Sequence, residues 1–223
     1  MELKMNINKR LQTVSSFVTD GSNIIDIGCD HALLDIYLAL NKKNLNIIAS
    51  DNKEGPLKHA KENVSKYQLD NQIKIKLGDG IATIEENTNT IIISGMGGLN
   101  IIGILKYKKD EYKNVNTLIL SPNNYTEKVR KEIAKLGFYI DDETLVKDKN
   151  IIYPVIVFKR GKKRYNKTEL LLGPILINNQ TEIFKEYIKK EKDTKEKLLS
   201  LLPKKYLKRR LELKRELKLI NKV

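Results

Sequence analysis

The feature that most constrains the fold of this chain is a repeated alternation of short apolar runs with helical patterns. Strands that are apolar on both faces belong to parallel sheets covered by helices on each side. The pattern, preceded by one more amphipathic helix around Arg10, therefore predicts a doubly wound α/β fold. The apolar runs lie at residues 23–27, 45–50, 73–77, 90–94 and 115–120, and the helical patterns at 31–40, 55–67, 99–107 and 126–136.

After Gly137 the pattern changes to two strand-like segments in succession, residues 138–146 and 150–159. The polar turn Lys147-Asp148-Lys149 joins them, which predicts a terminal antiparallel hairpin. Six or seven strands ending in such a hairpin are typical of the class I, S-adenosylmethionine-dependent methyltransferases, which have a Rossmann-like fold. Ordinary dinucleotide-binding domains do not end in this way.

Charge is distributed unevenly along the 223 residues, which carry 42 Lys and Arg against 28 Asp and Glu, a net charge of +14. Residues 1–158 hold 21 basic and 20 acidic side chains, whereas residues 159–223 hold 21 and 8, a net +13. A compositional bias toward lysine would not stop at one point of the chain. We therefore predict a near-neutral catalytic or ligand-binding domain, residues 1–160, and a basic appendage, residues 161–223, for a polyanion or a membrane surface.

The basic appendage has the sequence pattern of a helical pair. Beyond a hinge predicted at residues 161–165, helical patterns lie near 168–172, over 179–202 and over 204–221, with Pro203 between the last two. In the last two of these patterns, apolar side chains recur at steps of three and four residues. Arg210 interrupts this apolar pattern in the last helix, and Glu191 and Lys195 make the middle of the preceding helix polar. We predict an antiparallel helical coiled-coil hairpin of modest stability. Its predicted contact residues are Phe184, Ile188, Leu198, Leu202, Tyr206, Leu213, Leu217 and Ile220.

Several classes of protein are excluded by what the sequence lacks. One cysteine, Cys29, cannot form an internal disulfide, and two histidines with one cysteine cannot assemble a Cys/His zinc site, so we expect no metal. No run approaches the ~18 consecutive apolar residues of a membrane span, and the N-terminus has no hydrophobic signal region. We expect a cytoplasmic protein with no membrane partner, and no obligatory protein partner is evident.

An aspartate and a glycine mark the end of the first predicted strand, in the sequence Asp26-Ile27-Gly28-Cys29-Asp30-His31. The glycine lets the backbone approach a ligand, and the helix that follows offers unpaired N–H groups. Asp30 and Leu33 stand where a dinucleotide site would have its second and third glycines, which favours a cofactor without a pyrophosphate. By itself the segment also fits a plain strand end in any α/β protein.

Two more carboxylates follow the second and third predicted strands. Asp51 lies about 25 residues beyond Asp26, near the ~20-residue spacing at which a carboxylate meets ribose hydroxyls, and Asp79 lies between two glycines where it can accept from an adenine amino group. Because the carboxyl ends of parallel strands meet at one edge of a sheet, we predict a nucleoside-type cofactor there. The alternative is that both aspartates only cap helices or turns.

The fourth and fifth predicted strands end in small and polar residues. Three glycines in Ser94-Gly95-Met96-Gly97-Gly98 permit close backbone approach where cofactor and acceptor would meet, although a plain strand-to-helix turn has the same composition. The fifth strand ends in Ser121-Pro122-Asn123-Asn124. This resembles the Asn-Pro-Pro-Tyr tetrad of amino-group methyltransferases, but it follows the wrong strand, so we do not equate the two.

Taken together and in order, these motifs resemble those of the bacterial tRNA adenine-22-N1 methyltransferases, and the likeness covers nearly the whole chain. It rests on I-D-I-G-C-D-H-A, S-D-N-K-E-G-P-L, L-G-D-G, S-G-M-G-G and L-S-P-N. The resemblance implies that S-adenosylmethionine is the cofactor and S-adenosylhomocysteine the product. This chain departs from the family in having Cys29 and Leu33-Leu34-Asp35 in the first motif. The predicted cofactor-binding residues are Asp26, Gly28, Cys29, Asp51, Asn52, Asp79, Gly80, Ser94, Gly95 and Met96.

The reaction that the resemblance implies needs positioning more than a strong base, because adenine N1 has a free lone pair and no proton to remove. A carboxylate can offset the positive charge that develops on the ring. We predict Asp30 for this role and His31 for orienting the base, against the alternatives of a helix N-cap and an ordinary exposed residue. The predicted contacts to the acceptor base are Gly97, Gly98, Asn123 and Tyr153.

Basic side chains before the hinge and in the last helix predict phosphate contacts along a tRNA. Two other functions stay open: a methyltransferase of another RNA, a protein or a small molecule, and a non-catalytic RNA-binding protein. The predicted RNA-binding residues are Arg10, Lys162, Lys163, Arg164, Lys204, Lys205, Lys208, Arg209 and Lys214.

Overall fold

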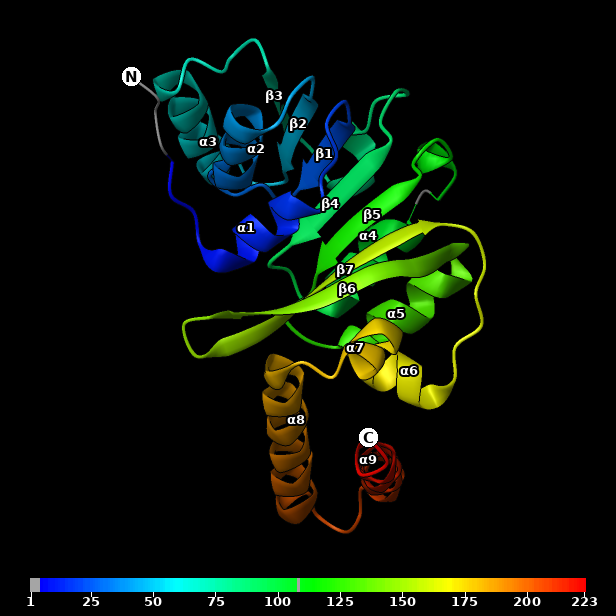
Figure 1. Ribbon diagram of the computed structural model, residues 1–223. Coiled ribbons are helices and arrows are strands. Elements are labelled where there is room, and N and C mark those ends of the chain that lie inside the picture. The colour runs from blue at the N-terminus through cyan, green and yellow to red at the C-terminus, as the bar shows by residue number, and fades with distance from the viewer. Residues whose placement is uncertain (1–4, 108) are drawn as a thin grey trace.

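A seven-stranded sheet organises the computed structural model, which describes residues 5–107 and 109–223 (Figure 1). The strand order is β3-β2-β1-β4-β5-β7-β6; β1 to β5 are parallel, and β7 runs antiparallel to both of its neighbours. The predicted doubly wound fold with a terminal hairpin is therefore confirmed. The strands are β1 (Asn23–Ile27), β2 (Asn46–Asp51), β3 (Ile73–Leu77), β4 (Thr90–Ser94), β5 (Thr117–Ser121), β6 (Phe138–Asp148) and β7 (Ile151–Arg160).

Helices cover both faces of the sheet because its strands are apolar on both sides (Figure 1). In β1, Ile24 packs in the core beneath α1, α2 and α3, whereas Ile25 and Ile27 pack in the core beneath α4 and α5. Burying one such side chain contributes about 1.5–3 kcal/mol. The helices of these layers are α1 (Lys9–Ser16), α2 (Leu33–Asn41), α3 (Glu54–Lys66), α4 (Gly98–Lys106) and α5 (Thr126–Lys135), with 3-10 turns η1 (Gly80–Thr83) and η2 (Lys109–Tyr112).

The C-terminal segment contains one more helix than predicted. The pattern assigned to a single helix over 179–202 is broken at Gln180, whose φ of 47° is left-handed, and Thr181 caps a new helix by accepting from the backbone N–H of Phe184. Helix α7 was not predicted, although Pro174 stands at its first position, where proline fits a helix start. The helices are α6 (Lys167–Leu172), α7 (Pro174–Asn179), α8 (Glu182–Leu201) and α9 (Leu207–Ile220).

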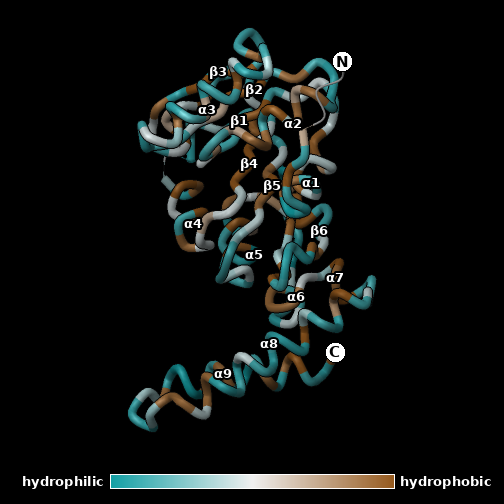
Figure 2. Tube along the Cα trace, turned by 90° about the vertical axis from the view of Figure 1, so that its left-hand side faces the viewer, coloured by the Kyte–Doolittle hydropathy of each residue, from teal (hydrophilic) through white to brown (hydrophobic). Residues whose placement is uncertain are grey.

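Helices α8 and α9 form an antiparallel pair that projects from the sheet (Figure 2). Lys195 of α8 pairs with Glu216 of α9 at 2.9 Å, while Arg210 donates to the carbonyl of Leu199 at 2.9 Å, so the two chains run in opposite directions. Phe184, Leu213 and Ile220 are buried as predicted. Leu198 and Tyr206, also predicted as contact residues, are 40% and 50% exposed.

A buried ion pair fixes α6 and α7, which precede the helical pair, to the sheet domain. The guanidinium of Arg130 in α5 lies 3.0 Å from the Glu143 carboxylate in β6, and neither side chain is exposed. Arg130 also donates to the carbonyls of Leu170 and Leu171 at the end of α6, and Glu143 accepts from the N–H of Ile175 in α7. One pair of charges thus ties α5, β6, α6 and α7 together.

The segment predicted as a hinge, residues 161–165, is held at both ends. The N–H of Gly161 donates to the Gly137 carbonyl, and the Tyr165 hydroxyl accepts from the N–H of Ile140 at 2.7 Å. Because Thr117, the first residue of β5, pairs with Lys159, this segment leaves from the amino-terminal edge of the parallel strands. No helix in residues 5–107 and 109–223 has the length and apolarity needed to cross a bilayer.

Candidate active site

The carboxyl ends of β1, β2 and β4 open into the largest of the described cavities, of about 770 Å³, within the 300–1,000 Å³ usual for ligand pockets. All ten residues predicted to bind the cofactor line it, and so do Asp30 and His31. The parallel pairing brings these residues together from separate parts of the sequence, as expected at such an edge. Other lining residues include Asn8, Arg10, Leu11, Leu33, Leu34, Lys53, Pro56, Asn100 and Ile104.

The loop after β1 has an unusual backbone that shapes the cavity floor. Gly28, Asp30 and Ala32 have φ values of 79°, 54° and 56°, in the left-handed region that favours glycine. A Cβ at Gly28 would lie 2.1 Å from Cε of Met96, so the flexible end of that methionine would have to move. The N–H groups of Gly28 and Cys29 both donate to the Ser50 carbonyl, which fastens the loop to β2.

This backbone corrects the predicted start of α2. The helix begins at Leu33 rather than His31, and Ala32 occupies the N-cap position with no side-chain cap. Asp30 is therefore not the helix cap, and its side chain is 71% exposed at the mouth of the cavity. His31 Nε2 lies 3.7 Å from an Asp30 carboxylate oxygen, and the His31 ring meets the edge of His59 at 5.3 Å.

Two buried carboxylates lie at the cavity, Asp26 in its lining and Asp35 outside the lining. Asp26 of β1 is 5% exposed, and burial, reinforced by the charge of Asp51, raises its pKa to about 7. Asp35 in the first turn of α2 is fully buried, and neither oxygen has a hydrogen-bond partner among the described residues. Burial and the neighbouring Asp26 raise the pKa of Asp35 well above its usual range. The sequence analysis named Asp35 only as a departure from the family and did not foresee its burial.

Cys29 is also buried, at 7% exposure. Burial and the surrounding aspartates, Asp35 first among them, raise the pKa of its thiol, so it stays protonated. The thiol is therefore a packing group of the cavity wall rather than a nucleophile.

The other two predicted carboxylates lie where their strands end. Asp51 accepts from the N–H of Lys53 at 3.0 Å and from the N–H of Asp30 at 3.3 Å, so it joins the ends of β1 and β2 while still lining the cavity. Asp79 stands before η1 but makes no side-chain cap to it. The sequence left open whether these two aspartates bind a cofactor or only cap helices and turns. Capping accounts for part of the Asp51 contacts and for none of the Asp79 contacts.

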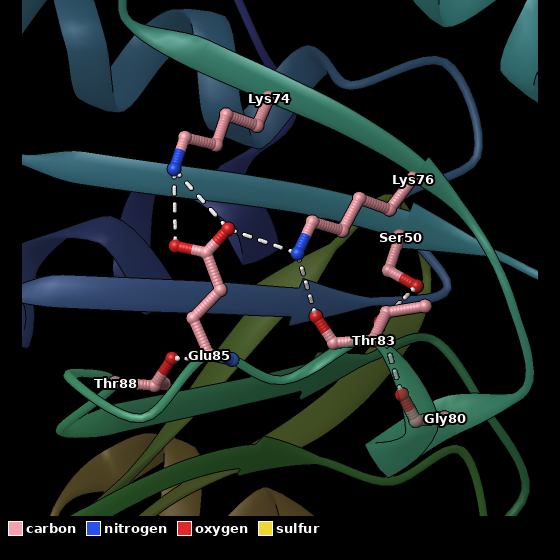
Figure 3. A network of polar contacts seen from close by, with 7 residues as sticks. All are labelled: Ser50, Lys74, Lys76, Gly80, Thr83, Glu85 and Thr88. Carbon is pink, nitrogen blue, oxygen red and sulfur yellow. Dashed lines mark hydrogen bonds and ion pairs between the residues drawn. The ribbon is translucent and has the colours of Figure 1, made fainter.

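A polar network that the sequence analysis did not predict holds the turn carrying Asp79 and Gly80 (Figure 3). Thr83 of η1 donates to the Ser50 hydroxyl at 2.8 Å and lies within hydrogen-bond distance of the Gly80 carbonyl. Lys74 and Lys76 of β3 converge on Glu85 at 3.0 and 2.9 Å, and Lys76 also reaches the Thr83 carbonyl. These contacts fix the cavity wall on the side of β3.

The residues predicted to contact the acceptor base lie beside the cavity rather than in its lining. Asn123 donates to the carbonyl of Gly95, and Asn124 accepts from the N–H of Gly98, which fastens the loop after β5 to the loop after β4. A Cβ at Gly98 would lie 2.4 Å from the Asn124 carbonyl, so that glycine has a packing reason. Tyr153 in β7 contacts the guanidinium of Arg10.

The predicted RNA-binding residues lie in α9 and the turn before it, in the segment after β7, and in the wall of the first cavity. Lys204, Lys205, Lys208 and Lys214 are exposed on α9 and the turn before it. Lys162, Lys163 and Arg164 are exposed at the opposite edge of the sheet from the cavity. Arg209 pairs with Glu212 and Glu216 beside a second cavity of about 500 Å³, between the helical pair and the loop after β5. Arg10 lies in the wall of the first cavity, a position that no sequence signal indicated.

Comparisons with known proteins point to one family. Residues 24–222 match the family model described as tRNA (adenine(22)-N(1))-methyltransferase. The enzyme of that name from Bacillus subtilis is 34% identical over 188 residues, 81% of this chain and 79% of that protein.

Two solved structures are similar along nearly their whole length. A putative tRNA (m1A22) methyltransferase from Streptococcus pneumoniae, in complex with S-adenosyl-L-methionine, has a TM-score of 0.87 and 31% identity, covering 97% of this chain and 99% of that one. TrmK from M. capricolum, in complex with S-adenosyl-homocysteine, has a TM-score of 0.84 and 25% identity, covering 98% and 97%.

Proposed function

This chain belongs to the tRNA (adenine(22)-N(1))-methyltransferase family, and we propose that it transfers a methyl group from S-adenosylmethionine to N1 of adenine 22 in tRNA. The observation that carries the proposal is the gathering of the family motifs around one cavity at the carboxyl edge of the sheet. The products are 1-methyladenosine in the tRNA and S-adenosylhomocysteine.

The residues around the cavity fit a cationic nucleoside cofactor. Asp26, Asp51 and Asp79 give it an acidic lining, and the Ser94 hydroxyl is buried there with no hydrogen-bond partner among the residues that the structure describes. Such an orphaned group is costly unless a ligand satisfies it. We assign Asp51 to the ribose hydroxyls, Asp79 to the adenine amino group and Asp26 to the amino-acid end. When bound, the cofactor supplies an electrophilic methyl group.

For the acceptor, the residues of this chain act by holding the base and balancing charge. Adenine N1 attacks with its own lone pair, so no side chain has to remove a proton. Asp30, at the cavity mouth, accepts from the exocyclic amine and offsets the positive charge that appears on the ring. His31, 3.7 Å from Asp30, orients the base from the side. Positioning of this kind supplies most of the acceleration in such a transfer.

The target base has to leave the tRNA stack, because N1 lies on its Watson–Crick edge. The domain of residues 161–223 then serves to grip the RNA, with the exposed lysines of α9 contacting phosphates. The domain of residues 1–160 holds the cofactor and performs the transfer.

The test is to incubate the protein with labelled S-adenosylmethionine and unmodified total tRNA, and then to map the modified base. We expect one labelled product, 1-methyladenosine at position 22, and loss of the label from a tRNA with guanine at that position. Label on another nucleotide would reject the assignment. So would label on protein when a cell extract treated with RNase replaces the tRNA.

A further inference from the structure

The side chain of Arg10, in α1, reaches the junction between the loops after β4 and β5, although it lies more than 80 residues before them in the sequence. Its guanidinium donates to the side-chain oxygen of Asn123 at 3.0 Å, and its carbon lies 4.5 Å from the centre of the Tyr153 ring. The guanidinium thus has an aromatic ring on its face and an amide oxygen at its edge.

The space around the guanidinium is tight. A Cβ added at Gly95 would lie 3.0 Å from Nη2 of Arg10, so a side chain at that position would push the guanidinium away. Gly95 also has a φ of 85°, which favours glycine. The position that the guanidinium fills is therefore a shaped slot between the Gly95 backbone, Asn123 and Tyr153.

The slot does not satisfy arginine completely. Nε of Arg10 is buried and has no hydrogen-bond partner among the described residues. No carboxylate pairs with Arg10 in the described part of the chain either. A buried donor left without a partner costs about 1–3 kcal/mol, so the slot is a poor final site for this side chain.

The same slot suits an adenine base. A flat ring stacks on tyrosine, and of the two N–H groups of the exocyclic amine, one donates to the amide oxygen of Asn123 while the other is left for Asp30. The guanidinium presents the same two features, since it is planar and carries N–H donors at its edge. The slot also adjoins Gly95 and Met96 of the cofactor cavity, where the methyl group has to meet its acceptor.

We propose that the guanidinium of Arg10 occupies the acceptor-base site of the free protein and that the target adenine displaces it. This inference rests on the proposed function and names the position of the base within it. Methylation makes the ring cationic, and a guanidinium left beside it would repel that charge. Displacement removes the repulsion and leaves Asn123 and Tyr153 free to hold the base.

The test measures adenosine binding to protein saturated with S-adenosylhomocysteine, by calorimetry or ligand-observed NMR. Arg10→Met keeps an unbranched side chain, shorter than arginine, and removes the planar cation, and we expect it to bind adenosine at least about ten-fold more tightly than the wild type. Lys9→Met, on the exposed side of the same helix, is the matched control and should bind adenosine as the wild type does. Affinity for S-adenosylhomocysteine should be the same in all three proteins.

A second measurement uses Arg10→Ala, which leaves the slot empty. Methylguanidinium should then compete with adenosine in this variant and not in the wild type. If Arg10→Met binds adenosine no more tightly than the wild type, or not at all, the proposal is wrong. Failure of the proposed function would look different, since the wild type would then leave adenine 22 of tRNA unmodified.

Discussion

Two buried acidic groups beside the cavity, Asp26 and Asp35, impose a cost on the free protein, and neither has a cationic partner among the described residues. Burial raises the pKa of both; the charge of Asp51 raises that of Asp26 further, and the charge of Asp26 raises that of Asp35 further. A group whose pKa is raised by folding stabilises the folded state below its unfolded pKa, and that contribution is lost as pH rises through the folded pKa. For Asp26 this window lies between about 4 and 7.

Asp35→Asn should therefore stabilise the free protein, and more so at high pH. Asparagine has the same shape and no charge to bury, so we expect a gain of about 1–3 kcal/mol at pH 8 that shrinks toward pH 5. Thermal unfolding followed by circular dichroism at several pH values measures it. A variant that is less stable than the wild type at pH 8, or a difference that does not change with pH, would contradict this account.

Asp30→Asn tests the residue assigned to the developing charge. Because Asp30 is exposed and does not cap α2, we expect the stability and the affinity for S-adenosylmethionine to stay within a few-fold of the wild type. The turnover number should fall by roughly 10²-fold, the effect of losing one electrostatic stabiliser. Asp70→Asn, an exposed carboxylate in the turn before β3, is the control. Loss of cofactor binding alone would defeat the assignment.

For single residues, the sequence predicted which side chains line the cavity where they directly follow a strand. It did not predict the lining residues that come from other elements. Gly28, Asp51 and Asp79 line the cavity because a strand end fixes where they lie. Arg10 reaches the same cavity from a helix whose docking depends on side-chain packing, and on an amphipathic helix an arginine has the pattern of a solvent-exposed residue. Glu85 pairs with Lys74 and Lys76 of β3 and so helps to hold the cavity wall, and no local motif indicates these ion pairs.

Among the elements, α5, β6, α6 and α7 depend on one ion pair. Arg130→Met would leave Glu143 buried without a charged partner, and breaking a buried pair in this way costs about 3–5 kcal/mol. The double variant Arg130→Met, Glu143→Met removes both charges, so it should lose less stability than the sum of the two single variants. Urea unfolding of the four proteins gives the coupling, and strictly additive losses would show that the pair does not act as a unit.

The predicted ends of helices and strands agree with the structure where apolar and polar residues alternate clearly. They disagree where the backbone conformation of a single residue sets the end of an element. The central strands were predicted within two residues, because apolar runs flanked by polar turns define them. The starts of α2 and α8 were misplaced because Ala32 and Gln180 adopt left-handed φ values that side-chain patterning does not reveal. In the helical pair, the antiparallel arrangement was predicted, and Arg210, where the apolar pattern is interrupted, donates to the carbonyls of Leu199 and Leu202 at the end of α8.

For the whole molecule, the net charge of +13 on residues 159–223 predicts tRNA binding that weakens with salt. Each phosphate contact contributes roughly −0.7 to −0.9 to the slope of log affinity against log salt concentration. A nearly flat response in a filter-binding titration would exclude several phosphate contacts. The number of these charges follows from the sequence. Their position in space does not, because it depends on how the helices from α6 to α9 pack against one another and against the sheet domain.

That placement separates two groups of basic residues that the sequence treats alike. Lys204, Lys205 and Lys208 lie at the tip and start of α9, whereas Lys162, Lys163 and Arg164 leave from the sheet edge opposite the cavity. A tRNA whose base enters the cavity has to approach from the carboxyl edge. Replacing the α9 triple with glutamine should therefore raise the tRNA dissociation constant more than tenfold at 0.1 M salt and reduce the salt slope by about 2–3.

The matched triple at residues 162–164 removes the same charge and should change the dissociation constant less than threefold. Both proteins should bind S-adenosylmethionine as the wild type does, because neither group lines the cavity. Equal losses in the two triples would mean that net charge, rather than the position of the helical pair, determines how tRNA is held. A larger loss at residues 162–164 would place the RNA across the amino-terminal edge of the sheet and contradict the proposed approach.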